Sequence, residues 1–256
     1  MHIQILGAHN LESKDTKHVS LLIDDVLAIE AGALTSSLPF SAQQKLQAIL
    51  LTHQHYDHIR DIPAIGMNFS LHEATIEVYS TQAVYDALTA TLLNGELYPN
   101  FMERPPEKPT IKFKLVAPNR TEQIGGYSVL AVPVNHNVPT VGYKITSADG
   151  KAVFYTSDTG PGLDDCWQQV SPELLITEVT APNRYEEFAL RSGHLTPGLL
   201  RQELERFREL KGYLPQVVLV HMNPLEEKKI EAEIAVVARS LNTQIRLGYE
   251  GMRITL

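Results

Sequence analysis

Four side chains that commonly bind transition metals lie within six residues of one another: His53, His55, Asp57 and His58. Imidazole nitrogens and carboxylate oxygens are ligands that zinc, iron and manganese all accept. On a tight loop after a strand, the first two histidines can point to one side while the last two residues reach the other. A polar surface loop with scattered histidines is the alternative, but few such loops hold four ligand-type side chains so close together. The segment 52–58, the histidine loop, therefore predicts a hydrolytic site with two metal ions.

Four residues cannot complete two coordination shells, so further ligands are expected downstream. His136, Asp158 and His221 each follow an apolar run, at a position where a polar side chain would otherwise be out of place. Taken alone, each of the three is a typical turn residue or hydrogen-bonding partner. Together with the histidine loop, they predict ligands at the ends of three strands.

Short β-branched or leucine-rich runs predict the elements that position the histidine loop. Residues 19–23 and 26–29 indicate a hairpin around Asp24 and Asp25, and residues 48–51 indicate a buried strand that delivers its C-terminal end to His53. The expected elements of this half are strands at residues 3–6, 19–23, 26–29 and 48–51, a strand closed by Tyr79, and helices at 39–46 and from Thr81 to about residue 93.

Beyond residue 110 the apolar pattern alternates and predicts a second sheet. A helix over residues 196–210 is indicated by Pro197 in its first turn, directly after a capping Thr196. Residues 94–109 contain one glycine and four prolines and are expected to form a loop or lid rather than a linker between domains. The predicted strands of this half are 111–116, 127–134, 141–145, 152–155, 174–176 and 217–220. The fold class is therefore α/β (α+β), with residues 1–256 forming one domain, a four-layer αββα sandwich.

Composition narrows the class of protein. The 30 acidic and 22 basic residues give a net charge of −8, which argues against a protein whose whole surface attracts nucleic acid. Neither a stretch of roughly 18 apolar residues nor a signal-peptide pattern is found, so a cytoplasmic protein without membrane contact is expected. The single cysteine, Cys166, follows two acidic residues that disfavour a reactive thiolate, and a structural role is expected for it.

The pattern His-x-His-x-Asp-His at 53–58 resembles the HxHxDH signature of the metallo-β-lactamase superfamily. The later His, Asp and His also occur in that family's order, so the resemblance extends over nearly the whole chain. It implies that Asp158 bridges two ions, which fits ions about 3.5–4 Å apart. The implied ligands are His53, His55 and His136 for one ion and Asp57, His58 and His221 for the other.

Three segments resemble the phosphodiesterase branch of the superfamily, including class II-like 3′,5′-cyclic-nucleotide phosphodiesterases. They are residues 135–143 (NHNVPTVGY), 155–159 (YTSDT) and 176–197, which contains Glu178 and Gly193-His194-Leu195-Thr196-Pro197. In the related tRNA 3′-end processing endonucleases, a His begins the segment before the equivalent Glu, whereas Thr177 stands here. That departure, the acidic balance and the lack of a Gly- and Lys-rich arm argue against a tRNA substrate. The β-lactamase branch is disfavoured because its bridging residue is usually Cys.

The resemblance thus implies a dinuclear metal-dependent phosphodiesterase that hydrolyses a small nucleotide phosphodiester, such as a 3′,5′-cyclic nucleotide, with a metal-bridging hydroxide. Asp57 would orient the water, and His194 would hydrogen-bond the phosphoryl oxygen or protonate the leaving group. Glu178 would fix the tautomer of His194 and raise its pKa. The alternative roles are structural: a residue beside a helix cap for His194 and a turn cap for Glu178.

Three alternative functions share this ligand set or part of it: a tRNA 3′-end processing endonuclease, a metal-dependent ester, lactone or thioester hydrolase, and a non-hydrolytic binding or redox module. Two divalent ions are expected, zinc first, with manganese and iron as alternatives. The expected partner is a small phosphodiester substrate rather than a large nucleic acid, and the resemblance implies a homodimer.

Other conspicuous side chains have competing interpretations. Tyr98 and Phe101 would form an aromatic wall for a base, or Phe101 would only anchor a surface loop. Trp167 is expected to pack beneath a helix that follows Pro161, with stacking on a nucleobase as the alternative. Four histidines have no ligand-type neighbours and are expected to be exposed or hydrogen-bonded, namely His2, His9, His18 and His72.

Overall fold

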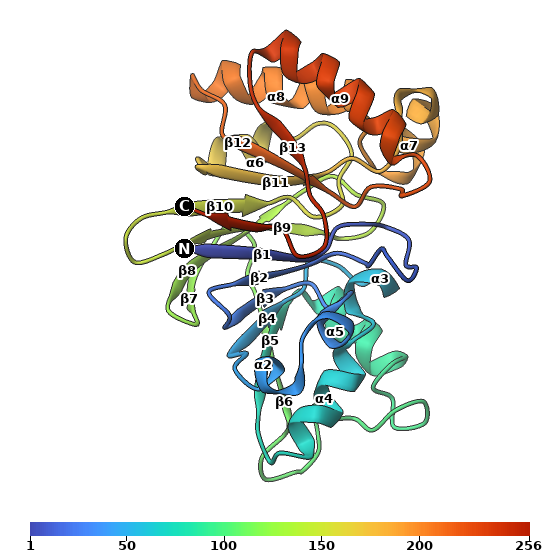
Figure 1. Ribbon diagram of the computed structural model, residues 1–256. Helices are drawn as coiled ribbons and strands as arrows, with labels where there is room; N and C mark the ends of the chain where they lie inside the picture. Colours follow the sequence, from blue (N-terminus) through green and yellow to red (C-terminus); the bar gives the residue numbers. More distant parts are fainter.

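The computed structural model describes all 256 residues, and its strands form two seven-stranded sheets that face each other (Figure 1). The first sheet, in the order β14-β1-β2-β3-β4-β5-β6, contains β1 (His2–Gly7), β2 (Ser20–Ile23), β3 (Leu27–Ile29), β4 (Ala48–Leu50), β5 (Ile76–Ser80), β6 (Ile111–Leu115) and β14 (Arg253–Thr255). The second, in the order β13-β12-β11-β10-β9-β8-β7, contains β7 (Thr121–Ile124), β8 (Tyr127–Pro133), β9 (Val141–Thr146), β10 (Ala152–Tyr155), β11 (Leu174–Glu178), β12 (Gln216–Val220) and β13 (Ile245–Leu247).

Helices cover the outer face of each sheet, as Figure 1 shows. Between the strands of the first sheet, the chain forms the helices α1 (Leu34–Ser37), α2 (Phe40–Gln43), α3 (Tyr56–Ile59), α4 (Ile62–Ser70) and α5 (Gln82–Ala90). The second has α6 (Asp164–Gln169), the 3-10 helix η1 (Asn183–Tyr185), α7 (Glu186–Ser192), α8 (Pro197–Lys211) and α9 (Glu227–Leu241). The longest, α8 and α9, have 15 residues each, fewer than the roughly 20 that crossing a bilayer requires, so no helix here could span a membrane.

The buried apolar side chains form three separate clusters. One lies between the two sheets, one between the second sheet and helices α6 to α9, and one between the first sheet and helices α1, α4 and α5. Three interfaces stacked in this way require four layers. The predicted αββα sandwich is thereby confirmed.

Parallel strands bring their C-terminal ends to one edge of each sheet. Strands β3 to β6 are parallel neighbours, and so are β10 to β13. Three residues at these ends have positive φ although they are not glycine: Glu30 after β3 (64°), Ser157 after β10 (64°) and His221 after β12 (61°). Such conformations are costly and persist only where the surroundings hold them, which is common at functional sites.

The predicted strands are found at their expected places, whereas two predicted helices were too long. Helix α2 ends at Gln43 because the amides of Lys45 and Leu46 bond to carbonyls only three residues back, in a tight turn. Helix α5 ends at Ala90, and its capping residue Thr81 makes no side-chain capping bond. Helix α8 begins as predicted, with the Thr196 hydroxyl accepting a hydrogen bond from an amide of its first turn. The short strands β7, β13 and β14 were not predicted.

Residues 91–110 contain no helix or strand, and Phe101 anchors them. Its ring is 4% exposed and packs so closely on α4 that a Cβ at Gly66 would lie 2.5 Å from it. The Phe101 carbonyl accepts a hydrogen bond from Ile111, the first residue of β6, whereas the histidine loop follows the opposite, C-terminal end of the neighbouring parallel strands. The anchored surface loop is therefore the interpretation that the structure supports, and an aromatic wall at the candidate site is not formed by Phe101.

We expect Phe101→Ala to lower the free energy of unfolding by about 3 kcal/mol, because it leaves a cavity against α4. Hydrolytic turnover should not change, since the ring lies at the other end of the sheet. Urea unfolding followed by circular dichroism measures the first quantity and a phosphodiester assay the second. Leu97→Ala, at a residue of the same loop that is 65% exposed, is the control. Loss of turnover without loss of stability would place the ring at the active site instead.

Candidate metal centre

The seven predicted ligands come from both sheets and converge at one edge of the sandwich. The histidine loop leaves β4, and the single turn of α3 then carries Asp57 and His58. The other ligands follow strands of the second sheet: His136 after β8, Asp158 after β10 and His221 after β12. Their ligand atoms form two groups, in each of which all atoms lie within 4.8 Å of one another.

The first group contains His53, His55, His136 and Asp158. His55 Nδ1 lies 3.0 Å from His53 Nε2 and 3.3 Å from His136 Nε2. A tetrahedral zinc ion with bonds of about 2.0–2.1 Å holds its ligand atoms about 3.3 Å apart. The spacing of these nitrogens therefore suits one ion of this size.

The second group contains Asp57, His58, His221 and again Asp158. Asp158 Oδ2 lies 3.3 Å from the Nε2 atoms of both His58 and His221, and Asp57 Oδ2 lies 3.3 Å from His221 Nε2. Asp158 thus belongs to both groups. All seven residues are brought together in the two sets that the resemblance implied, with the carboxylate between them.

The charges of the site fit bound cations. The ion-pair partners of Asp57 and Asp158 are histidines, with no Lys or Arg among them. Burial would raise the pKa of the Asp158 carboxyl, but His221 and His58 outweigh it and hold that pKa well below its usual range. Both ring nitrogens of the fully buried His58 and Oδ1 of Asp158 lack a hydrogen-bond partner. Buried polar atoms of this kind are normally satisfied, and a metal ion would satisfy His58 Nε2, the nitrogen that faces Asp158.

The protonation states also suit ligands. Burial lowers the pKa of His53, His55 and His136, so these imidazoles are neutral and free to donate a lone pair. Burial would lower the pKa of His58 as well, but the carboxylates of Asp158, Glu30 and Asp57 raise it well above its usual value. The positive charge of a protonated His58 therefore balances these carboxylates, as a cation bound by the second group would.

His194 and Glu178 lie beside the second group. The Nδ1 atom of His194 is 2.6 Å from Glu178 Oε1, and its ring stacks on that of His221 with centroids 5.4 Å apart. Burial would lower the pKa of His194, but the Glu178 carboxylate outweighs it and raises the pKa to about 9.

Gly193, in the left-handed region at φ 72°, ends α7 and places its carbonyl 2.8 Å from His136 Nδ1. A Cβ there would lie 3.0 Å from the same nitrogen, so glycine suits this close approach.

The sequence patterns did not identify three residues whose side chains contact the Nδ1 atoms of the candidate histidine ligands. Glu30 lies 3.1 Å from His58 Nδ1, the Thr52 hydroxyl lies 2.9 Å from His53 Nδ1, and the Thr180 hydroxyl lies 2.8 Å from His221 Nδ1. Glu30 had a usable signal, since it is a lone charge within the apolar run Leu27–Leu34. The two threonines are not distinguishable from ordinary polar residues at strand ends.

The remaining conspicuous side chains lie elsewhere. Trp167 is 1% exposed and donates its indole N–H to Glu203 within the core of the second sheet, so it cannot stack on a nucleobase. Cys166 is buried, and burial raises the pKa of its thiol, as expected of a structural residue. His2 and His72 are exposed, and His9 is buried in a hydrogen bond with Glu250. His18 is half-buried and its Nδ1 atom has no hydrogen-bond partner, so the expectation of an exposed or hydrogen-bonded side chain was wrong for this histidine.

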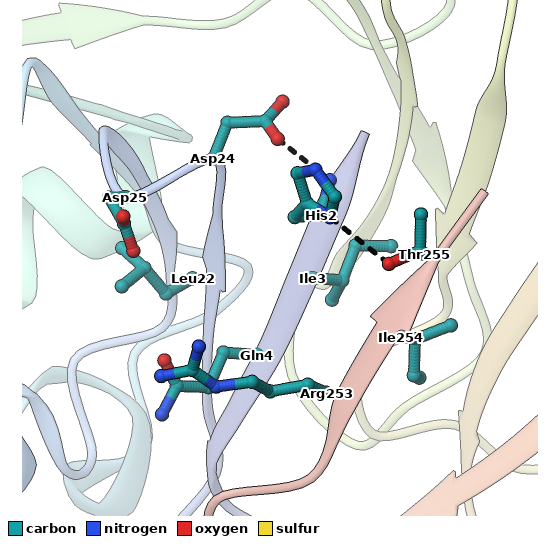
Figure 2. Close-up of a pocket in the computed structure, with 9 residues that line it drawn as sticks. All are labelled: His2, Ile3, Gln4, Leu22, Asp24, Asp25, Arg253, Ile254 and Thr255. Carbon is teal, nitrogen blue, oxygen red and sulfur yellow. Dashed lines mark hydrogen bonds between the residues drawn. The ribbon is translucent and has the colours of Figure 1, made fainter.

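An open groove of about 590 Å³ between β1, β14 and the β2–β3 turn is shown in Figure 2. It lies at the start of β1, at the opposite end of the first sheet from the histidine loop. Some of its polar groups are hydrogen-bonded: His2 Nδ1 lies 3.0 Å from the Thr255 hydroxyl, and Asp24 accepts hydrogen bonds from the His2 amide and from the Tyr127 hydroxyl. The groove contains no cluster of ligand-type side chains comparable to the metal centre.

The profile of the family described as "Beta-lactamase superfamily domain" matches residues 20–222, a span that contains all seven ligands. The chain belongs to the metallo-β-lactamase superfamily. The curated relatives that it matches are distant. It is 24% identical over 260 residues to an octanoyltransferase of Porphyromonas gingivalis, 26% over 91 residues to a 3′,5′-cyclic-nucleotide phosphodiesterase of Candida albicans, and 25% over 170 residues to a ribonuclease Z of Pyrococcus horikoshii. These matches cover 98%, 36% and 60% of the chain and 47%, 20% and 52% of the respective relatives, so the chain spans about half the length of these proteins or less.

Solved structures of superfamily members share the fold. Unliganded yeast PDE1 superposes with a TM-score of 0.85 at 16% identity, covering 100% of this chain and 99% of that one. The short form of human tRNase Z gives a TM-score of 0.70 at 19% identity over 100% and 99%. At these identities the likeness establishes the metallo-β-lactamase fold and leaves the substrate undetermined.

Loading with zinc should raise the temperature of thermal unfolding, because ions that bind only the folded state stabilise it. At a free zinc concentration about 100 times the dissociation constant, each site contributes about 2.7 kcal/mol. For a chain of this length two such sites correspond to a shift of roughly 10 °C or more. Differential scanning fluorimetry of chelated and zinc-loaded protein measures the shift. Equal unfolding temperatures for the two samples would contradict a metal centre built from these ligands.

Proposed function

We propose that the protein is a dinuclear metal-dependent phosphodiesterase that acts on a small nucleotide phosphodiester. The observation that carries this proposal is the shared Asp158 between two ligand groups, with the His194–Glu178 pair next to the second group. Phosphodiester hydrolysis needs charge stabilisation at both the attacking and the leaving oxygen, and a close pair of cations suits this need. Zinc is the ion we propose, and the metal content of the purified protein tests it against manganese and iron.

Three side chains, Asp57, His194 and Glu178, would take part in the reaction together with the bound ions. Two bound divalent ions would supply a water of lowered pKa and neutralise charge on the phosphoryl group. The Asp57 carboxylate, whose side chain is 26% exposed at the mouth of the site, can accept a hydrogen bond from the attacking water and orient it. His194, protonated at neutral pH, would donate to a phosphoryl oxygen or protonate the leaving ribose oxygen. Glu178 accepts a hydrogen bond from His194 Nδ1–H, which leaves Nε2–H for the substrate.

The charges near the site support a small substrate over RNA. Arg60, two residues after His58, forms ion pairs with Glu12 and Asp61. Arg184, on η1, lies 2.6 Å from Glu226 Oε1. Long RNA substrates require a track of unpaired basic groups for their phosphates. Paired arginines at both positions favour a substrate with a single phosphodiester.

One of the relatives supports the same choice, and another gives a specific alternative. One is a 3′,5′-cyclic-nucleotide phosphodiesterase, matched over 36% of this chain, and another is a ribonuclease Z, matched over 60%. The longer match favours tRNA 3′-end processing as the second candidate. Hydrolysis of a carboxylic ester, lactone or thioester by the same activated water is a third. A homodimer stays a prediction, which light scattering after gel filtration would test.

The deciding experiment compares substrates on one preparation. Zinc-loaded protein is assayed on bis-p-nitrophenyl phosphate, 3′,5′-cyclic AMP and GMP, a precursor tRNA with a 3′ trailer, and p-nitrophenyl acetate. We expect hydrolysis of bis-p-nitrophenyl phosphate and of both cyclic nucleotides, and none of the tRNA or the acetate. The Asp57→Ala variant should hydrolyse none of these substrates. Faster cleavage of the tRNA trailer than of cyclic nucleotides would favour the endonuclease. Phosphodiester hydrolysis no greater than that of Asp57→Ala would contradict the proposal.

A further inference from the structure

A second buried carboxylate lies behind the metal centre. Glu30 follows β3, is 0% exposed and has a φ of 64°. Its Oε1 atom accepts a hydrogen bond of 2.5 Å from the Thr52 hydroxyl, and its Oε2 atom lies 3.3 Å from the Thr52 amide. No Lys or Arg lies within ion-pair distance; its charged partner is His58 Nδ1, at 3.1 Å. A buried anion in a strained backbone conformation is costly, so a compensating role is expected of it.

Glu30 reaches one histidine of each ligand group. His58, in the second group, directs Nε2 toward Asp158, and Nδ1 toward Glu30. The Nδ1–Oε1 contact, at 3.1 Å, is within ion-pair distance but is not aligned as a hydrogen bond in this structure. His53, in the first group, directs Nε2 toward His55, and its Nδ1 lies 2.9 Å from the Thr52 hydroxyl, which donates to Glu30. The Glu30 carboxylate therefore contacts a histidine of the second group directly and a histidine of the first group through the Thr52 hydroxyl.

A similar series of contacts, from a carboxylate through a threonine to a histidine, occurs in the second sheet, but it reaches only the second ligand group. The Thr180 hydroxyl donates to Glu178 Oε2 at 2.7 Å and lies 2.8 Å from His221 Nδ1. Glu178 thus reaches a histidine of the second group through a threonine, as Glu30 reaches His53. Its other side-chain partner is His194, which belongs to neither of the two groups that contain Asp158. The two carboxylates differ in how many of these groups they support.

We propose that Glu30 is a positioning residue that couples the two metal subsites. It holds the Nδ1–H of His58 and, through Thr52, that of His53, so that both imidazoles present Nε2 to the ions. Hydrogen bonds of this kind fix the tautomer and increase the basicity of a histidine ligand, and their loss typically costs about 10- to 100-fold in metal affinity. The proposal rests on the metal centre of the proposed function and is independent of the substrate.

Zinc titration against a chromophoric chelator, with the metal content of each variant, tests this coupling. We expect Glu30→Gln to weaken both binding steps by about 10- to 100-fold. Thr52→Val, which removes only the relay to His53, should weaken one step, and Glu178→Gln should weaken one step through His221. Glu203→Gln is the matched control, since Glu203 is 6% exposed, accepts hydrogen bonds from the Gly162 amide and the Trp167 indole, and should leave both steps unchanged.

Two outcomes would overturn the proposal: wild-type zinc affinity in Glu30→Gln, or a loss confined to one of its two steps. If the circular dichroism spectrum shows that Glu30→Gln does not fold, Thr52→Val decides, and two unchanged steps in that variant overturn the relay. Zinc binding is measured without any substrate. A protein that binds two ions in this manner and hydrolyses no phosphodiester would therefore contradict the proposed function and leave the role of Glu30 intact.

Discussion

Asp158→Asn should lower kcat/KM for a phosphodiester by about 1000-fold or more, equivalent to about 4 kcal/mol of transition-state stabilisation. The Asp158 carboxylate belongs to both ligand groups, and an amide has no charge with which to hold two cations close together. The metal content of the purified variant should fall below two ions per chain. Steady-state kinetics and elemental analysis measure the two effects.

The matched control for this variant is Asp61→Asn. Asp61 is also buried, at 3% exposure, and it accepts hydrogen bonds from the Thr35 amide and from Arg60, but it belongs to neither ligand group. We expect it to retain both ions and most of the activity. Full metal content and wild-type kcat/KM in Asp158→Asn would show that this carboxylate is not the bridge.

Glu178→Gln should move the alkaline limb of the profile of kcat/KM against pH to lower pH. The Glu178 carboxylate raises the pKa of His194 to about 9, so the protonated imidazole is present below that pH and is lost as the pH rises through it. Without the carboxylate, burial becomes the dominant influence and lowers the pKa, so the proton is lost earlier. The profile should be recorded at saturating zinc, so that weaker metal binding does not contribute.

His194→Ala should lower kcat by about 100- to 10,000-fold, as expected when a general acid is removed. The effect should be smaller for a substrate with a p-nitrophenolate leaving group, which needs little protonation, than for a cyclic nucleotide. Equal losses on both substrates would assign His194 to binding the phosphoryl oxygen. An alkaline limb at the same pH in wild type and Glu178→Gln would exclude His194 as the group that titrates there.

Local signals in the sequence were sufficient to single out the candidate metal ligands that the structure brings together. The histidine loop places four of them within six residues, and His136, Asp158 and His221 each end an apolar run. Which ligands share an ion was not a local property, because it depends on how strands of two sheets meet. That pairing followed from the family resemblance, and the distances in the structure agree with it.

Glu30 shows where sequence patterns are insufficient. It follows strand β3, but it stands within an apolar run, and a carboxylate at a strand end has many ordinary partners. Its partner Thr52 lies 22 positions away and comes close only because β3 and β4 pair with Ile29 opposite Leu50. The predicted end of α2 was wrong for a different reason, since a tight turn at Lys45 and Leu46 overrides helical spacing. A tertiary contact decides the first feature, and local hydrogen bonds decide the second.

The contribution of both sheets to each ligand group has a consequence for the order of events during synthesis. The last residue of the first group to leave the ribosome is Asp158, whereas the second group must wait for His221. Neither group is assembled until the strands that carry these residues have docked onto the sheet that carries the histidine loop. A nascent chain that ends before His221 can therefore hold one complete ligand group at most, and loading of the second ion marks the docking of the finished sandwich.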